Sequence, residues 1–126
     1  MVDCWFNEEE RILYIKATGE IRYNYFTEGL KLLRNDKSLP KRFSILEDAS
    51  EVSINLPETK LKAIAASLNE ISENFENVRH ALVLKDPLTT AFAFILKELI
   101  KSDRYSFRVF STMDAAKNWI AGKNEN

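Results

Sequence analysis

The most constraining feature of this sequence is a short run in which every residue is apolar. Residues 79–85 read RHALVLK, and positions 81–84 carry only Ala, Leu and Val. Because successive side chains of a strand point to opposite faces, such a run predicts a strand covered on both faces, as in the centre of a parallel sheet. Parallel strands need crossover connections, usually helices. The run therefore predicts an α/β fold.

Segments with strand and helix character alternate along the rest of the chain. Strands are predicted at residues 2–6, 11–18, 44–49, 79–85 and 106–110. The first two form an antiparallel hairpin across a polar turn, and Gly19 is predicted to end the second. The fold class is therefore α/β, with a five-stranded, mostly parallel sheet, an antiparallel N-terminal hairpin strand and four helices. Residues 1–126 are predicted to form one domain, with residues 122–126 as a flexible tail.

The helix starts carry recognisable signals. Asn24, Asp86 and Ser111 are predicted to cap three helices, because short polar side chains accept hydrogen bonds from the first backbone N–H groups. Proline is tolerated in the first helical turn, so Pro57 and Pro87 are predicted to lie there.

Composition narrows the functional classes. The 126 residues carry 18 Lys and Arg against 19 Asp and Glu, a net charge of −1, which argues against a dedicated nucleic-acid or membrane-surface binder. No apolar run approaches the ~20 residues needed to cross a bilayer, and no signal peptide is visible, so a cytoplasmic location is expected. One cysteine, one histidine and three scattered glycines predict neither a metal site nor a phosphate loop, and no cofactor is expected.

Three charges lie between apolar neighbours inside the predicted strands: Lys16, Glu47 and Arg108. Such charges usually mark the more solvated face of a sheet. Right-handed crossovers between neighbouring strands would place all the helices on the other face. We therefore expect the charged face to be partly open or covered by a second subunit, with Lys16 and Glu47 paired across adjacent strands.

The polar residues that follow the strand at 44–49 form the densest candidate site. Asp48, Ser50, Glu51, Ser53 and Asn55 lie in a predicted loop at the carboxyl edge of the sheet, where ligands of open α/β sheets collect. Helix capping accounts for Asn55 but not for the carboxylates. We interpret this loop as a surface that binds a partner protein. His80, at the start of its strand, is predicted to be a structural or surface residue.

The helix over residues 88–100 has a wider apolar surface than one sheet contact needs. Phe92, Phe94 and Leu96 could pack in the core, line a pocket for an apolar ligand, or form a dimer contact. Core packing is the first interpretation, and a homodimer contact follows closely, because Phe92 and Phe94 cannot both face the same side of a helix.

The sequence resembles the SpoIIAA-like proteins, which share the STAS fold, and is most similar to the STAS/SEC14-like branch. The resemblance spans residues 12–120 and depends on Asp48-Ala49-Ser50 and on the terminal Val109, Phe110, Ala116 and Trp119. It implies a βα superhelix and a non-enzymatic regulatory role. In anti-sigma antagonists of this family a serine at the start of the following helix is phosphorylated. Residues 54–57 read INLP here, so no serine stands at that place, and Ser50 and Ser53 lie upstream.

Two functions remain open from the sequence. The first is a regulatory or protein-interaction module that binds a partner through the loop after the central strand. The second, which the SEC14-like resemblance implies, is a carrier or sensor of a small apolar ligand or lipid. An enzyme is disfavoured, since no nucleophile–base pair, metal cluster or phosphate loop is evident.

Overall fold

The computed structural model describes residues 1–122 and is built around one five-stranded sheet. Its strands follow the order of the chain. β1 is antiparallel to β2, and β2 to β5 are parallel, which confirms the predicted sheet. The strands are β1 (Val2–Asn7), β2 (Ile12–Ile21), β3 (Arg42–Ile54), β4 (Asn77–Val83) and β5 (Tyr105–Phe110).

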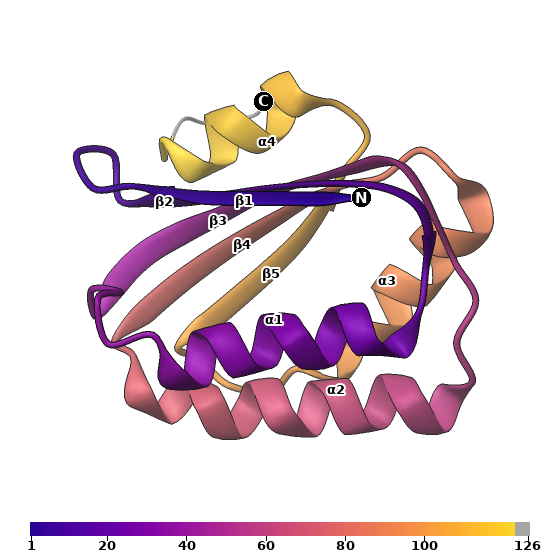
Figure 1. Ribbon diagram of the computed structural model, residues 1–126, viewed down its shortest axis with the longest axis horizontal. Helices are drawn as coiled ribbons and strands as arrows, with labels where there is room; N and C mark the ends of the chain where they lie inside the picture. The colour runs from indigo at the N-terminus through magenta and orange to yellow at the C-terminus, as the bar shows by residue number, and fades with distance from the viewer. Residues whose placement is uncertain (123–126) are drawn as a thin grey trace.

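The helices lie on both sides of this sheet. α1 (Tyr23–Asn35), α2 (Glu58–Ile71) and α3 (Pro87–Leu99) connect neighbouring parallel strands and share one face, which we call the inner face (Figure 1). α4 (Met113–Ile120) follows the last strand and lies on the opposite, outer face. The expectation that all helices share a face is therefore wrong for α4, because a helix that leads to no further strand is not constrained by crossover handedness.

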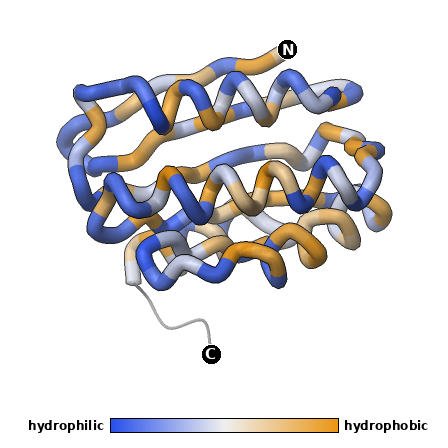
Figure 2. Tube along the Cα trace, turned by 90° about the horizontal axis from the view of Figure 1, so that it is seen from below, coloured by the Kyte–Doolittle hydropathy of each residue, from blue (hydrophilic) through white to orange (hydrophobic). Residues whose placement is uncertain are grey.

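Two apolar cores result. The larger one packs the inner face of the sheet against α1, α2 and α3, and the view from below in Figure 2 shows hydrophilic and hydrophobic residues alternating along these helices. The smaller one joins Ala81 and Val83 of β4 to Ala116 and Trp119 of α4. Because Val78 and Leu82 belong to the inner core, β4 is covered on both faces, as its sequence predicted. Over β1 the outer face stays open, with Trp5 53% exposed.

The helix ends agree only in part with the predicted caps. The Asp86 carboxylate accepts a hydrogen bond from the backbone N–H of Thr89 at 2.9 Å, and Pro87 is the first residue of α3, as predicted. Thr112, not Ser111, caps α4. α1 begins one residue before Asn24, so Asn24 lies inside the helix and does not cap it. Pro57 lies immediately before α2, not within its first turn.

Two further observations complete the description of the fold. Gly122, at φ +76°, follows α4, and the rest of the predicted tail, residues 123–126, lies outside the described residues. Within residues 1–122, no helix has both the length and the apolar character that a membrane crossing requires.

Candidate ligand-binding cleft

The segment predicted to be a partner-binding loop is the second half of strand β3. Residues 51–54 pair with residues 18–21 of β2 after a register shift between Lys16 and Thr18. Gly19, at φ +92°, lies within this extension and does not end β2, so that prediction is wrong. The alternation of side chains between the two faces of the strand is broken at the register shift. For that reason the pattern of the sequence suggested a loop.

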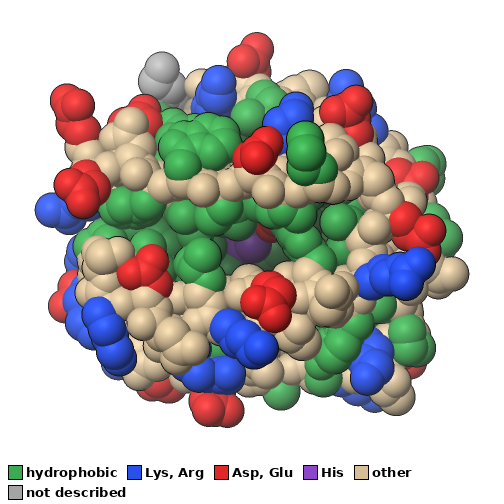
Figure 3. Space-filling view, viewed as in Figure 1, with side chains coloured by type: hydrophobic (Ala, Val, Ile, Leu, Met, Phe, Trp, Pro, Cys, Tyr) green, Lys and Arg blue, Asp and Glu red, His purple; other side chains and the backbone are tan. Residues whose placement is uncertain are grey.

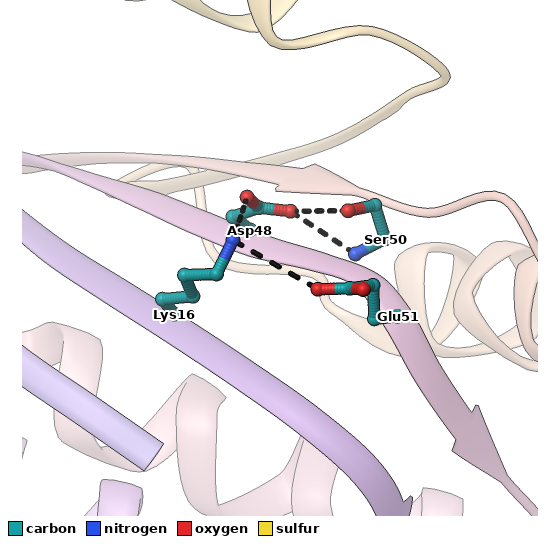
Figure 4. Close-up of polar contacts among 4 residues, drawn as sticks. All are labelled: Lys16, Asp48, Ser50 and Glu51. Carbon is teal, nitrogen blue, oxygen red and sulfur yellow. Dashed lines mark hydrogen bonds and ion pairs between the residues drawn. The ribbon is translucent and has the colours of Figure 1, made fainter. Parts of the chain in front are cut away.

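On the outer face, three of the predicted site residues lie together around Lys16 (Figure 4). The Lys16 ammonium is 3.3 Å from the Asp48 carboxylate and 4.0 Å from that of Glu51. The Ser50 hydroxyl and backbone N–H donate to Asp48 at 2.7 and 3.1 Å. Burial raises the pKa of Asp48, but the bonds from Ser50 and Lys16 outweigh it and hold that pKa below its ordinary value. Ser53 and Asn55 lie farther along the chain and are exposed.

The predicted pair between Lys16 and Glu47 is wrong. The register places Lys16 opposite Asp48 and Ile15 opposite Glu47. Because adjacent strand residues point to opposite faces, Glu47 lies on the inner face, away from Lys16. Its exposure is 8%, so the charge does not mark the solvated face.

Glu47 is held on the inner face by side chains from α1 and β4. The Tyr25 hydroxyl donates to Oε2, and Nε2 of His80 is 2.7 Å from Oε1. Nδ1 of His80 is in turn 2.6 Å from the Tyr105 hydroxyl on β5. With a neutral imidazole, Nε2–H donates to Glu47 and Nδ1 accepts from Tyr105. We call these four residues the polar floor. His80, a residue of β4, thus connects Glu47 on β3 to Tyr105 on β5.

The polar floor holds Glu47 ionised and both tyrosines protonated at neutral pH. Burial raises the pKa of Glu47, but the hydrogen bonds from His80 and Tyr25 outweigh burial and leave that pKa below its ordinary value. Burial and the Glu47 carboxylate raise the pKa of Tyr25 and Tyr105 far above the ordinary tyrosine value. The phenols therefore act as hydrogen-bond donors.

A cleft of about 570 Å³ opens above this floor, between the sheet and α1. Figure 3 shows it as a groove with apolar walls and the single histidine at its base. On β1, Val2 (46% exposed) and Cys4 face the cleft and remain accessible, so it is open at this edge. Burial raises the pKa of the Cys4 thiol.

Gly29 contributes to the opening from the helix side. It lines the cleft from α1, one helical turn after Tyr25 and one before Leu33. A Cβ atom built at this glycine would meet nothing within 4 Å. The missing side chain therefore leaves the wall of the cleft open beside Tyr25.

The sequence matches no family model and no curated protein. Two solved structures are similar over nearly the whole chain. An uncharacterized protein of the DUF3478 family with a SpoIIAA-like fold, from Shewanella loihica PV-4, is 16% identical, with a TM-score of 0.56 over 95% of this chain and 92% of that one. An anti-sigma factor antagonist from Mycobacterium paratuberculosis is 18% identical, with a TM-score of 0.58 over 96% of this chain and 95% of that one. This chain has a SpoIIAA-like, or STAS, fold.

Within this SpoIIAA-like fold, the three candidate residues of α3 take different positions. Leu96 is buried and lines the cleft. Phe92 is half-buried against the inner core. Phe94 points elsewhere and is 52% exposed, beside the exposed Ile95. The three do not form one contact surface, and only Leu96 belongs to the cleft.

The polar floor could not be identified as a unit from the sequence. Glu47 and His80 are 33 residues apart, and Tyr25 and Tyr105 lie in separate segments. Single ionisable residues inside two strands were a signal, because one can neutralise the cost of burying the other when the strands are neighbours. The information needed to connect them was that these consecutive strands are neighbours in the sheet.

Proposed function

We propose that this chain is a non-enzymatic SpoIIAA-like module that binds a small apolar molecule in the cleft between the sheet and α1. The observation that supports this most directly is the cleft itself. Its volume of about 570 Å³ falls within the roughly 300–1,000 Å³ typical of small-molecule sites. Such sites combine apolar walls with a few converging polar groups, and the polar floor supplies those groups. Among the two functions left open by the sequence, the geometry supports ligand binding better.

The position of the cleft also favours an occupant. Protein interiors are normally packed as densely as organic crystals. Here Ile15, Ile45 and Leu82 of the sheet, together with Phe26 and Leu33 of α1, line an accessible space. An apolar ligand that covered ~200 Å² of such surface would gain about 5 kcal/mol, before the cost of immobilisation.

Gly29 provides the test, with a matched pair of variants. Binding of the neutral apolar dye Nile red measures whether the cleft can be occupied. The Gly29→Leu variant should place a side chain into the opening and so weaken dye binding at least tenfold. A folding defect is not expected to cause this loss, because a glycine-to-leucine change in a helix does not disfavour folding. The Gly29→Ala control should bind as the original protein does. Equal dye binding by the leucine variant, or no dye binding by the unaltered protein, would contradict the proposal.

A second candidate function is partner binding through the outer face of β3. It is supported by the exposed carboxylate of Glu51, the exposed Ser53 and Asn55, and the similarity to an anti-sigma factor antagonist. The Glu51→Lys variant reverses an exposed charge, so it should remove a co-purified partner. The unfolding midpoint should not change, because the Asp48–Ser50 contacts stay in place. Retention of the same partner would count against this surface.

A homodimer is the related proposal for α3. Leu88, Phe94 and Ile95 are 56%, 52% and 42% exposed. Exposed apolar groups of this kind favour contact with another protein surface. Light scattering should then report a dimer for the unaltered protein and a monomer for Phe94→Glu. A monomeric unaltered protein would refute it.

A further inference from the structure

The polar floor restricts which apolar molecules the cleft can take. The side chains of Glu47 and His80 are 11% and 12% exposed. Both lie on the inner face and line the cleft, so the exposure that they keep is to its interior. A ligand that fills the cleft must therefore either satisfy these groups or remove the water that reaches them.

Glu47 is the member of the floor with capacity for a further hydrogen bond. An ionised carboxylate offers about four acceptor sites. Among the described residues, Tyr25 and His80 donate one hydrogen bond each, to different oxygens. Both nitrogens of His80 are already engaged, one by Glu47 and one by Tyr105. A ligand can thus be received by Glu47 as acceptor without displacing a partner.

The charged side chains that line the cleft are mainly acidic. The acidic and basic side chains that line it are Glu20, Arg22, Glu28 and Glu47, three carboxylates and one guanidinium. Arg22 is exposed at the N-terminal end of α1, whereas Glu47 is buried at the base. Because charges interact more strongly in a low-dielectric interior, the buried carboxylate of Glu47 makes the largest contribution to the electrostatic potential at the base of the cleft. The floor favours a hydrogen-bond donor or a cation and disfavours an anion.

We propose that Glu47 is the ligand-binding carboxylate of the cleft, and that it receives the donor end of an apolar molecule, a hydroxyl or an ammonium group. A fatty-acid carboxylate is disfavoured at this position by like-charge repulsion. This inference rests on the proposed ligand-binding function and names the class of ligand.

A purely structural network would leave different evidence. Tyr25, Glu47, His80 and Tyr105 join α1, β3, β4 and β5. If that were the only role of the polar floor, its loss would lower stability but would not alter which ligand end the cleft prefers. The preference among ligands of equal apolar length is therefore the decisive measurement.

The experiment compares decanol, decylamine and decanoate as competitors of bound Nile red, at neutral pH and below their micelle-forming concentrations. The unaltered protein should bind decanol and decylamine at least tenfold more tightly than decanoate, since hydrogen bonds to charged groups typically change binding by about tenfold to a hundredfold. In the Glu47→Gln variant this preference should fall to about threefold or less, while Nile red binds as before. The matched control is Glu98→Gln on the exposed side of α3, which should keep the full preference.

A second variant keeps the inference falsifiable if Glu47→Gln does not fold. Tyr25→Phe removes one donor to Glu47, so the preference for decanol and decylamine should increase. Equal affinity for the three decyl compounds, or tighter binding of decanoate, would overturn the role of Glu47 and leave the cleft as a ligand site. Failure of the unaltered protein to bind Nile red or any decyl compound would overturn the proposed function as well.

Discussion

Replacing His80 with leucine should destabilise the protein by about 4 kcal/mol. Glu47 is 8% exposed and lies 2.7 Å from the imidazole, and removing one partner of such a buried pair costs about 3–5 kcal/mol. The lower end of this range applies, because Tyr25 still donates to the carboxylate. The Tyr105 hydroxyl loses its acceptor as well, which adds about 1 kcal/mol.

The double variant Glu47→Leu/His80→Leu separates this cost from the loss of packing. Replacing both members of a buried pair by apolar residues of similar volume is often neutral or stabilising. Most of the lost 4 kcal/mol should therefore return. Urea unfolding with linear extrapolation gives each free energy of unfolding, and the double-mutant cycle gives the coupling. A double variant as unstable as His80→Leu would refute the assignment of the cost to the unpaired carboxylate.

The pH dependence gives an independent check with a definite sign. In the unaltered protein the pKa of Glu47 lies below its ordinary value. The resulting stabilisation is present above the pKa of the unfolded chain and is lost as pH falls through the folded-state pKa. In His80→Leu the main opposing bond is gone, so burial raises the pKa of Glu47. At neutral pH that variant is destabilised by the buried, unpaired charge of Glu47, and protonation of Glu47 at lower pH removes this charge. The stability gap should narrow between neutral pH and about pH 4, and a constant gap would contradict the account.

Three further substitutions test separate parts of the fold by urea unfolding. The fully buried Thr89 hydroxyl accepts from the backbone N–H of Ile54 at 3.0 Å, so Thr89→Val should cost about 1–3 kcal/mol and Thr89→Ser clearly less on that account. Trp119→Ala should cost about 3–5 kcal/mol, because Trp119 is the largest side chain between α4 and the sheet; a loss below 1 kcal/mol would show that α4 does not seal this face. Lys16→Ala should cost less than about 1 kcal/mol, since the ion pair with Asp48 is half exposed and screened by salt, and a larger loss would contradict that view of the outer face.

The parts of the fold that the sequence predicted well are those with local signals. The apolar run of β4 established a central strand, and the Asp86-Pro87 pair established the start of α3. The order of the strands agrees with the βα superhelix that the resemblance implied. α4 was placed on the wrong face, because handedness applies only to helices between two parallel strands. The second half of β3 was missed, because its register shift breaks the alternation that identifies a strand.

The cleft on the inner face was not identified from the sequence, for a related reason. The outer-face residues Asp48, Ser50 and Glu51 are adjacent in sequence, so their density was visible. The residues of the cleft come from every strand and from all three inner helices. The gap left by Gly29 has no local signature, since a glycine inside a helix reads only as a weak helix former. A cavity is a property of packing between distant segments, and it becomes visible only when those segments are assembled.

Stability alone does not account for a glutamate at position 47. The other inner-face side chains around it on β3, Ile45 and Ala49, are apolar, and leucine at both positions 47 and 80 should restore most of the stability, with a remaining loss from the unpaired tyrosine hydroxyls. A buried charge that the fold does not need is commonly retained for what it binds. The double variant therefore separates two roles of Glu47. If it keeps most of the stability of the unaltered protein and still binds Nile red but no longer distinguishes decylamine from decanoate, the carboxylate serves ligand recognition more than the fold.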